Sequence, residues 1–142
     1  MKYNVIIADD FEHDIELVAI ELKQTGKFNI VHKAQDGIEV IQYLEGHPPF
    51  NDRNLFPLPH FLMLDLKMRK VDGFQVLRWI KERQFPIVTF VVTGFELENY
   101  TALARGLGAA AIFFKPLSRD NVEHMIFLAE RLVTDLVESS AA

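Results

Sequence analysis

Carboxylates, a hydroxyl and an ammonium group stand at the ends of short apolar runs in this sequence. Asp9 and Asp10 follow the first run, Asp65 ends the third, Thr93 follows the fourth and Lys115 ends the fifth. Carboxylates about 4 Å apart repel one another by roughly 4 kcal/mol at an effective dielectric constant near 20, so three crowded together need cations. Lys115 supplies one positive charge, and Mg²⁺ suits the rest because it accepts carboxylate ligands.

A magnesium ion beside a free carboxylate, a lysine and a hydroxyl favours a site that receives a phosphoryl group. Asp65 is the candidate nucleophile, because carboxylates form aspartyl phosphates. Lys115 would neutralise the phosphoryl oxygens and Thr93 would donate a hydrogen bond to them. Taken singly, each residue has another explanation: Asp10 and Thr93 as helix caps, Asp65 as a turn residue and Lys115 as a solvated lysine.

The elements that must position these residues alternate along the chain. Four of the five apolar runs are almost continuously apolar, which is typical of strands buried on both faces of a parallel sheet, and the second is more polar, as at a sheet edge. Apolar residues at helical spacing lie between the runs. The runs are YNVIIA (3–8), FNIVH (28–32), HFLMLD (60–65), PIVTFVV (86–92) and AAIFFK (110–115), and the helical positions are Ile15, Val18, Ala19 and Leu22, then Phe74, Leu77 and Ile80, then Leu97, Tyr100, Ala104 and Leu107.

This alternation predicts an α/β, doubly wound parallel sheet. Ligands bind such sheets beyond the carboxyl ends of the strands, where the candidate residues lie. A last helix is predicted from the apolar stripe between Val122 and Leu136. The segment 46–59 holds four of the six prolines and predicts a long loop entering the third strand at the end opposite Asp65.

Length and composition narrow the function classes. The 142 residues suit one domain, 1–142, without a separate output domain. The net charge of −5 and the lack of a basic stripe argue against direct nucleic-acid binding. The chain has no Cys, and no run of about 20 apolar residues predicts a membrane span. We therefore expect a cytoplasmic protein with neither nucleic acid nor membrane as a partner.

The order of the motifs resembles the CheY-like receiver domain of two-component response regulators over nearly the whole chain. The resemblance implies a flavodoxin-like five-stranded sheet, strand order 2-1-3-4-5, with five helices, and phosphotransfer from a histidine kinase to Asp65. The long loop and extended last helix are similar to stand-alone receivers that serve phytochrome-type and other hybrid sensor kinases. The motifs are IIADD at 6–10, LMLDLKM at 62–68, VDGF at 71–74, VVTG at 91–94 and FFKP at 113–116.

The same resemblance implies a complete set of site roles. Asp65 is expected to be the phosphoacceptor, and Mg²⁺ the cofactor. The other implied roles are ligation of Mg²⁺ by Asp10, Asp65 and the backbone carbonyl of Lys67, with Asp9 acting through water; phosphoryl stabilisation by Thr93 and Lys115; and support from Gly94 and from Pro116, which is expected after a cis peptide bond.

Four residues depart from the family pattern or add to it. Arg69 stands where the family usually has Pro, and Ile112 replaces the usual aromatic switch residue, so we expect signalling through the last two helices and last strand without a rotamer switch. Phe95, two residues after Thr93, predicts slow self-dephosphorylation if it shields the site, whereas a ring in solvent would have no such effect. Phe127 lies opposite the apolar stripe of the last helix and is a candidate interface residue with Ile112.

The expected partners are a sensor histidine kinase or a histidine phosphotransfer protein, and a downstream protein; a homodimer through the same surface is left open. We expect no enzymatic activity beyond self-phosphotransfer and self-dephosphorylation. An aspartyl-nucleophile phosphatase is disfavoured because Lys67 stands where its general acid would be. A flavodoxin is disfavoured because Asp9 and Asp10 would repel the flavin phosphate. A receiver-fold scaffold that is not phosphorylated remains the alternative.

Overall fold

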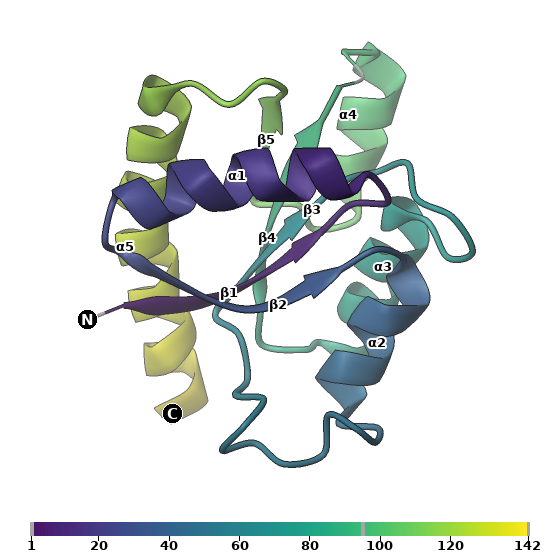
Figure 1. The fold of residues 1–142 in the computed structure, drawn as a ribbon, viewed down its shortest axis with the longest axis vertical. Helices are drawn as coiled ribbons and strands as arrows, with labels where there is room; N and C mark the ends of the chain where they lie inside the picture. The colour runs from purple at the N-terminus through teal and green to yellow at the C-terminus, as the bar shows by residue number, and fades with distance from the viewer. Residues whose placement is uncertain (1, 95, 142) are drawn as a thin grey trace.

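The computed structural model describes residues 2–94 and 96–141, and the side chains of 2–94 and 96–133. Five strands alternate with five helices (Figure 1). The elements are β1 (Tyr3–Ala8), α1 (Glu12–Gln24), β2 (Phe28–Ala34), α2 (Gly37–Glu45), β3 (Phe61–Leu64), α3 (Gly73–Arg83), β4 (Val88–Thr93), α4 (Glu98–Gly106), β5 (Ala111–Phe114) and α5 (Arg119–Ala141).

All four strand pairings are parallel, and the sheet order is β2-β1-β3-β4-β5. The flavodoxin-like topology expected from the sequence is therefore confirmed, with the more polar β2 at an edge. The three central strands carry three of the four continuous apolar runs: β3 is buried at every position, as are the last four residues of β1. The fourth run forms β5, which lies at the other edge of the sheet instead of being covered on both sides, and only its Phe113 is buried. All five strands point the same way, so their carboxyl ends share one edge of the sheet.

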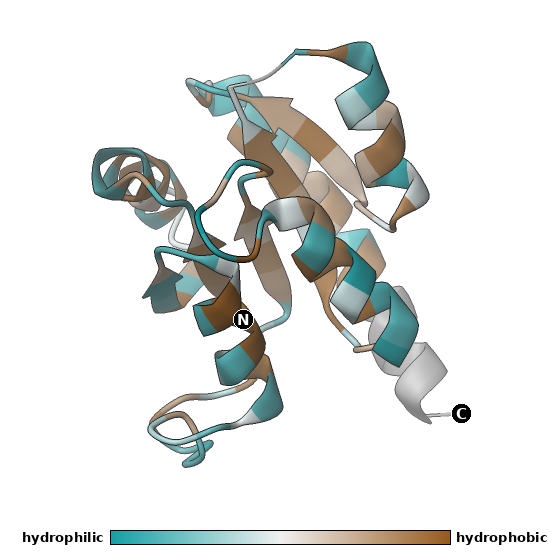
Figure 2. Cartoon of the chain, turned by 90° about the vertical axis from the view of Figure 1, so that its right-hand side faces the viewer, coloured by the Kyte–Doolittle hydropathy of each residue, from teal (hydrophilic) through white to brown (hydrophobic). Residues whose placement is uncertain are grey.

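The helices form two layers around the sheet. Helices α1 and α5 cover one face, and α2, α3 and α4 cover the other (Figure 1). Coloured by hydropathy, the strands form a brown, apolar centre between helices that turn their teal, polar sides outward (Figure 2). Each face of the sheet therefore has its own hydrophobic core, and burial of these cores is the main force that holds the strand ends in place.

Two helices on the second face begin at side-chain caps. Asp36 accepts a hydrogen bond from the backbone N–H of Glu39, and Asp72 forms a reciprocal capping box with Gln75 at the start of α3. Helix α2 ends at Gly46, whose φ of 73° lies in the left-handed region that favours glycine.

Helix α4 differs from the sequence expectation. The spacing of Leu97, Tyr100, Ala104 and Leu107 predicts a buried stripe, but only Ala104 is buried, and Leu97 and Tyr100 are exposed. This nine-residue helix reaches the core only through its last turn, so its other apolar side chains lie on the surface.

Within the described residues, no helix has the length and apolar character needed to cross a lipid bilayer.

The proline-rich segment 46–59 contains turns but no strand or helix, as expected, and lies at the amino-terminal end of β3, the lower end in Figure 1. It is packed against α2 rather than extended into solvent. Phe50 is buried, with its ring 5.1 Å from that of Tyr43 and 4.9 Å from that of His32. The Tyr43 hydroxyl donates to the carbonyl of Pro57 at 2.8 Å, and Arg53 donates to the carbonyl of Leu44 at 3.1 Å.

Candidate functional site

The carboxyl ends of four strands bring the candidate residues to one edge of the sheet. Backbone hydrogen bonds extend the strand pairing into the site: Asp65 N donates to Ala8 O, and Lys115 N donates to Thr93 O, each at 2.9 Å. These bonds hold Asp65 beside the end of β1 and Lys115 beside the end of β4. The Lys115–Pro116 peptide bond is cis.

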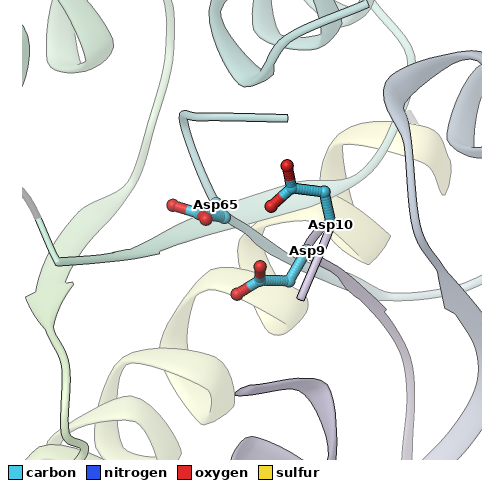
Figure 3. Close-up of side chains that lie close together, drawn as sticks. All are labelled: Asp9, Asp10 and Asp65. Carbon is cyan, nitrogen blue, oxygen red and sulfur yellow. The ribbon is translucent and has the colours of Figure 1, made fainter. Parts of the chain in front are cut away.

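Three carboxylates meet at this edge. Asp9, Asp10 and Asp65 each place a carboxylate oxygen within 4.8 Å of the others (Figure 3). Asp9 and Asp65 are buried, and Asp10 is half-buried. Helix α1 has Phe11 as its N-cap residue, without a side-chain hydrogen bond, so Asp10 does not cap the helix. Asp9 accepts a hydrogen bond of 3.0 Å from the backbone N–H of Phe11, which holds its carboxylate beside those of Asp10 and Asp65.

The ammonium of Lys115 is surrounded by three carboxylates. Its Nζ lies 2.5 Å from Asp9 Oδ2, 2.9 Å from Asp14 Oδ2 and 3.4 Å from Asp65 Oδ2. The Lys115 side chain is 19% exposed, so these charges interact away from bulk water. Asp14 was not among the residues expected at the site from the sequence. The available signal was its place four residues after Asp10. A helix that follows directly on the first strand has its first turn there, close to the carboxyl end of that strand.

The charges around Asp65 oppose its ionisation when no metal is bound. Burial and the negative charge of Asp9 raise the pKa of Asp65 to about 6, although Lys115 counteracts the shift. Burial alone would lower the pKa of Lys115, but its hydrogen bonds to Asp9 and Asp14 raise that pKa above its usual value. The group of carboxylates is therefore short of positive charge.

An open pocket of about 370 Å³ lies over these residues. Thr93 is completely buried at the end of β4, five residues before α4 begins, so it does not cap that helix. Arg69, which replaces the usual proline, donates a long hydrogen bond of 3.5 Å to the backbone carbonyl of Asp10. The pocket is lined by Asp9, Asp10, Phe11, Asp14, Asp65, Lys67, Met68, Arg69, Gly94 and Lys115.

The donor set fits a hard divalent cation. Asp65 Oδ1 is buried and accepts no hydrogen bond within the described part of the chain. A buried carboxylate oxygen without a partner is unfavourable unless a ligand or cation satisfies it. Mg²⁺ prefers such oxygen ligands and keeps several waters, for which the open pocket leaves room.

Phe95, on which the prediction of slow self-dephosphorylation rests, lies outside the described residues.

The two candidate interface residues lie away from this pocket. Ile112 is half-buried in β5 and packs against the core on the α2, α3 and α4 side of the sheet. Phe127 on α5 is 54% exposed, with the guanidinium of Arg131 5.4 Å from its ring centre and His124 stacked at 6.5 Å. Phe127 therefore belongs to the surface, whereas Ile112 contributes mainly to packing.

Comparison with known proteins identifies a consistent family. Residues 5–127 match the family model described as the response regulator receiver domain. The transcriptional regulatory protein PdtaR of Mycobacterium tuberculosis is 31% identical over 126 residues, which cover 88% of this chain and 55% of that protein. The probable transcriptional regulatory protein NarL of the same organism is 25% identical over 121 residues, which cover 85% of this chain and 51% of that protein. The chain spans about half the length of these curated relatives.

Solved receiver structures share the fold. The signal receiver domain of NarL from Mycobacterium tuberculosis superposes with a TM-score of 0.77 at 24% identity, covering 91% of this chain and 97% of that one. A chain of the CheX-CheY-BeF3-Mg complex from Borrelia burgdorferi superposes with a TM-score of 0.71 at 27% identity, covering 88% and 87%.

Proposed function

Because the chain belongs to the response regulator receiver family, we propose that it accepts a phosphoryl group on Asp65 and passes on a signal through a changed protein-binding surface. One observation carries the proposal: Asp65 Oδ1 is buried without a hydrogen-bond partner among the described residues, beneath an open pocket and next to Lys115. A phosphoryl group or a cation that enters the pocket could satisfy this oxygen.

The proposed reaction is transfer from a phosphorylated histidine. An Asp65 carboxylate oxygen attacks the phosphorus atom, the P–N bond breaks, and the imidazole leaves with the electron pair and takes up a proton. The ammonium of Lys115 holds charge beside the phosphoryl oxygens, and the Thr93 hydroxyl donates to them. Acetyl phosphate can replace the histidine donor; its P–O bond then breaks and acetate leaves.

We propose that Asp10, Asp65 and the backbone carbonyl of Lys67 hold Mg²⁺, with Asp9 acting through water. When bound, Mg²⁺ supplies positive charge that offsets the negative charge of the phosphoryl oxygens. The orphaned Asp65 oxygen and the three neighbouring carboxylates support this assignment. The solved Borrelia burgdorferi neighbour, a complex of CheX and CheY with BeF3 and Mg, is consistent with it.

The proposed donor is a sensor histidine kinase, a histidine phosphotransfer protein or both. We propose that the transfer takes place in the cytoplasm, because the phosphoryl group of such donors derives from ATP. The proposed output surface is formed by α4, β5 and α5. Its exposed apolar residues support a protein-binding role: Leu97 at the N-cap of α4, Tyr100 and Leu103 on α4, and Phe127 on α5. A homodimer through this surface is part of the same proposal.

The test is intact-mass spectrometry after incubation with acetyl phosphate and Mg²⁺. The wild-type protein should gain the mass of one phosphoryl group, and Asp65→Asn should gain none. Asp52→Asn is the matched control, because Asp52 is an exposed aspartate of the proline-rich segment, and the amide can still accept from the N–H of Asn54. If wild type and Asp65→Asn both remain unmodified while BeF3⁻ also fails to bind, the proposal is wrong and the scaffold alternative stands.

A further inference from the structure

Among the described residues, Asp14 is the one carboxylate around Lys115 that comes from a helix rather than from a strand end. It lies in the first turn of α1, and its Oδ2 accepts a hydrogen bond from Lys115 Nζ at 2.9 Å across 101 residues of sequence. This distance is shorter than the 3.4 Å between Lys115 Nζ and Asp65 Oδ2. In this arrangement Lys115 is therefore bound more closely to Asp14 than to the proposed phosphoacceptor.

The three carboxylates together occupy the bonding capacity of the lysine. An ammonium group has three N–H donors and no acceptor, and Asp9, Asp14 and Asp65 each take one. A phosphoryl oxygen on Asp65 can gain a hydrogen bond from Lys115 only if one of these contacts is released. Asp14 is the most accessible of the three, with a side chain 32% exposed against 4% for Asp9 and 9% for Asp65.

Asp14 stands outside the group of carboxylates that can share a metal ion. That group consists of Asp9, Asp10 and Asp65. Asp14 lines the edge of the site instead, at the wall between the open pocket and an apolar groove formed with Leu17 and Pro116. Its carboxylate therefore acts on the site through Lys115 and through its own negative charge.

We propose that Asp14 is a positioning residue that holds the Lys115 ammonium in the unphosphorylated protein and competes with the incoming phosphoryl group for it. The proposal rests on the function proposed above and adds a control on how strongly the site holds a phosphoryl group. By the same charge, Asp14 favours the arrival of a cation and opposes the arrival of an anion. Its removal should therefore move these two affinities in opposite directions.

The test measures two binding equilibria. Mg²⁺ alone is titrated by calorimetry, and BeF3⁻ is then titrated at saturating Mg²⁺ by ¹⁹F NMR, because BeF3⁻ is an anionic analogue of the phosphoryl group. Asp14→Asn keeps an oxygen acceptor for Lys115 but removes the charge, and Asp14→Ala removes both. Both variants should bind BeF3⁻ about three- to tenfold more tightly and Mg²⁺ more weakly by a similar factor, as one charge a few ångströms away implies.

The matched control is Glu16→Gln. Glu16 lies on the same helix and pairs with Lys33 at 2.8 Å, so this variant removes one negative charge from α1 without touching Lys115. It should leave both affinities within about twofold of wild type, because exposed charges are largely screened. Thermal unfolding of each variant checks that the fold is retained.

Three results would overturn the inference. If both affinities fall in the Asp14 variants, Asp14 has a structural role. If Asp14→Ala weakens BeF3⁻ binding while Asp14→Asn does not, Asp14 aims Lys115 at the phosphoryl group rather than competing for it. If neither affinity changes, the contact has no effect on the site. Failure of the wild-type protein to bind BeF3⁻ with Mg²⁺ would instead refute the proposed function itself, and this inference with it.

Discussion

Gly73, the first residue of α3, lies directly against the backbone of Asp65. A Cβ atom at Gly73 would come within 2.4 Å of the Asp65 carbonyl oxygen and 2.7 Å of Leu66 Cα. The two segments are also joined by a hydrogen bond from Gly73 N to Leu66 O at 2.9 Å. The loop that carries the candidate phosphoacceptor is therefore held by the start of α3 at a distance that admits only glycine.

Gly73→Ala should lower the free energy of unfolding by about 2–3 kcal/mol, because the methyl group meets backbone atoms that cannot rotate away. It should also weaken Mg²⁺ binding, because Asp65 must shift. Gly106→Ala is the control: a Cβ there meets nothing within 4 Å, and alanine favours the helix by up to about 1 kcal/mol. Urea unfolding measures the change in stability of both variants, and a Mg²⁺ titration measures the change in affinity. A Gly73→Ala protein as stable as wild type would contradict this close packing.

Asp65 should make the metal-free protein less stable at neutral pH. Its pKa is about 6 in the folded protein and near 3.8 when unperturbed, so the folded state binds more protons than the unfolded state between these values. The contribution of Asp65 is therefore fully favourable below pH about 4 and is lost as the pH rises through about 6.

Asp65→Asn should accordingly be more stable than wild type at pH 8 in EDTA, on the order of 2–3 kcal/mol, and the difference should shrink toward pH 4. Urea unfolding of both proteins across this range measures the difference. Saturating Mg²⁺ should reduce it at high pH by stabilising wild type. A pH-independent difference between the two proteins would rule out this account of Asp65.

The proline-rich segment should be anchored by the ring of Phe50. This side chain is 7% exposed and packs among His32, Tyr43 and Phe56. Phe50→Ala should cost about 3 kcal/mol of unfolding free energy through lost burial and a cavity. Leu55→Ala, in the same segment but at a side chain 71% exposed, should cost less than about 0.5 kcal/mol. Equal losses in the two variants would show that Phe50 does not anchor the segment.

His60 should add a second pH dependence at the opposite end of the sheet. Its Nδ1 accepts the backbone N–H of Asn4 at 2.9 Å, and burial lowers the pKa of His60 below its usual value. As the pH falls below about 6.5, the unfolded chain takes up a proton that the folded protein resists, so stability is lost. His60→Asn retains an acceptor and should lose less stability than wild type between pH 7.5 and about 5.5; identical pH profiles would exclude the effect.

The alternation of strands and helices and the position of the site followed from local sequence features, whereas the sheet order came from the family resemblance. Continuously apolar runs are long enough for strands but not for helices, and parallel strands must place their carboxyl ends at one edge. Asp9, Asp10, Asp65 and Lys115 were therefore expected together, and the structure gathers their charged groups within a few ångströms.

Three features could not be predicted from sequence because they depend on how elements pack across the fold. Helical spacing alone predicted burial of the apolar side of α4, but the helix meets the core only at its last turn, through Ala104. Proline content predicted a loop at 46–59 but not the ring packing that holds it, since the rings of Phe50 and His32 meet only after α2 packs on β2.

Asp14 is the third feature, and it shows where local reasoning ended. An aspartate in the first turn of a helix is explained by the helix dipole alone. Its contact with Lys115 depends on α1 crossing the sheet so that its first turn reaches the end of β5, 101 residues further along the chain. The sequence by itself determined which strands form the site and which side chains end them. The tertiary packing of a helix on that sheet decided which carboxylate the lysine holds.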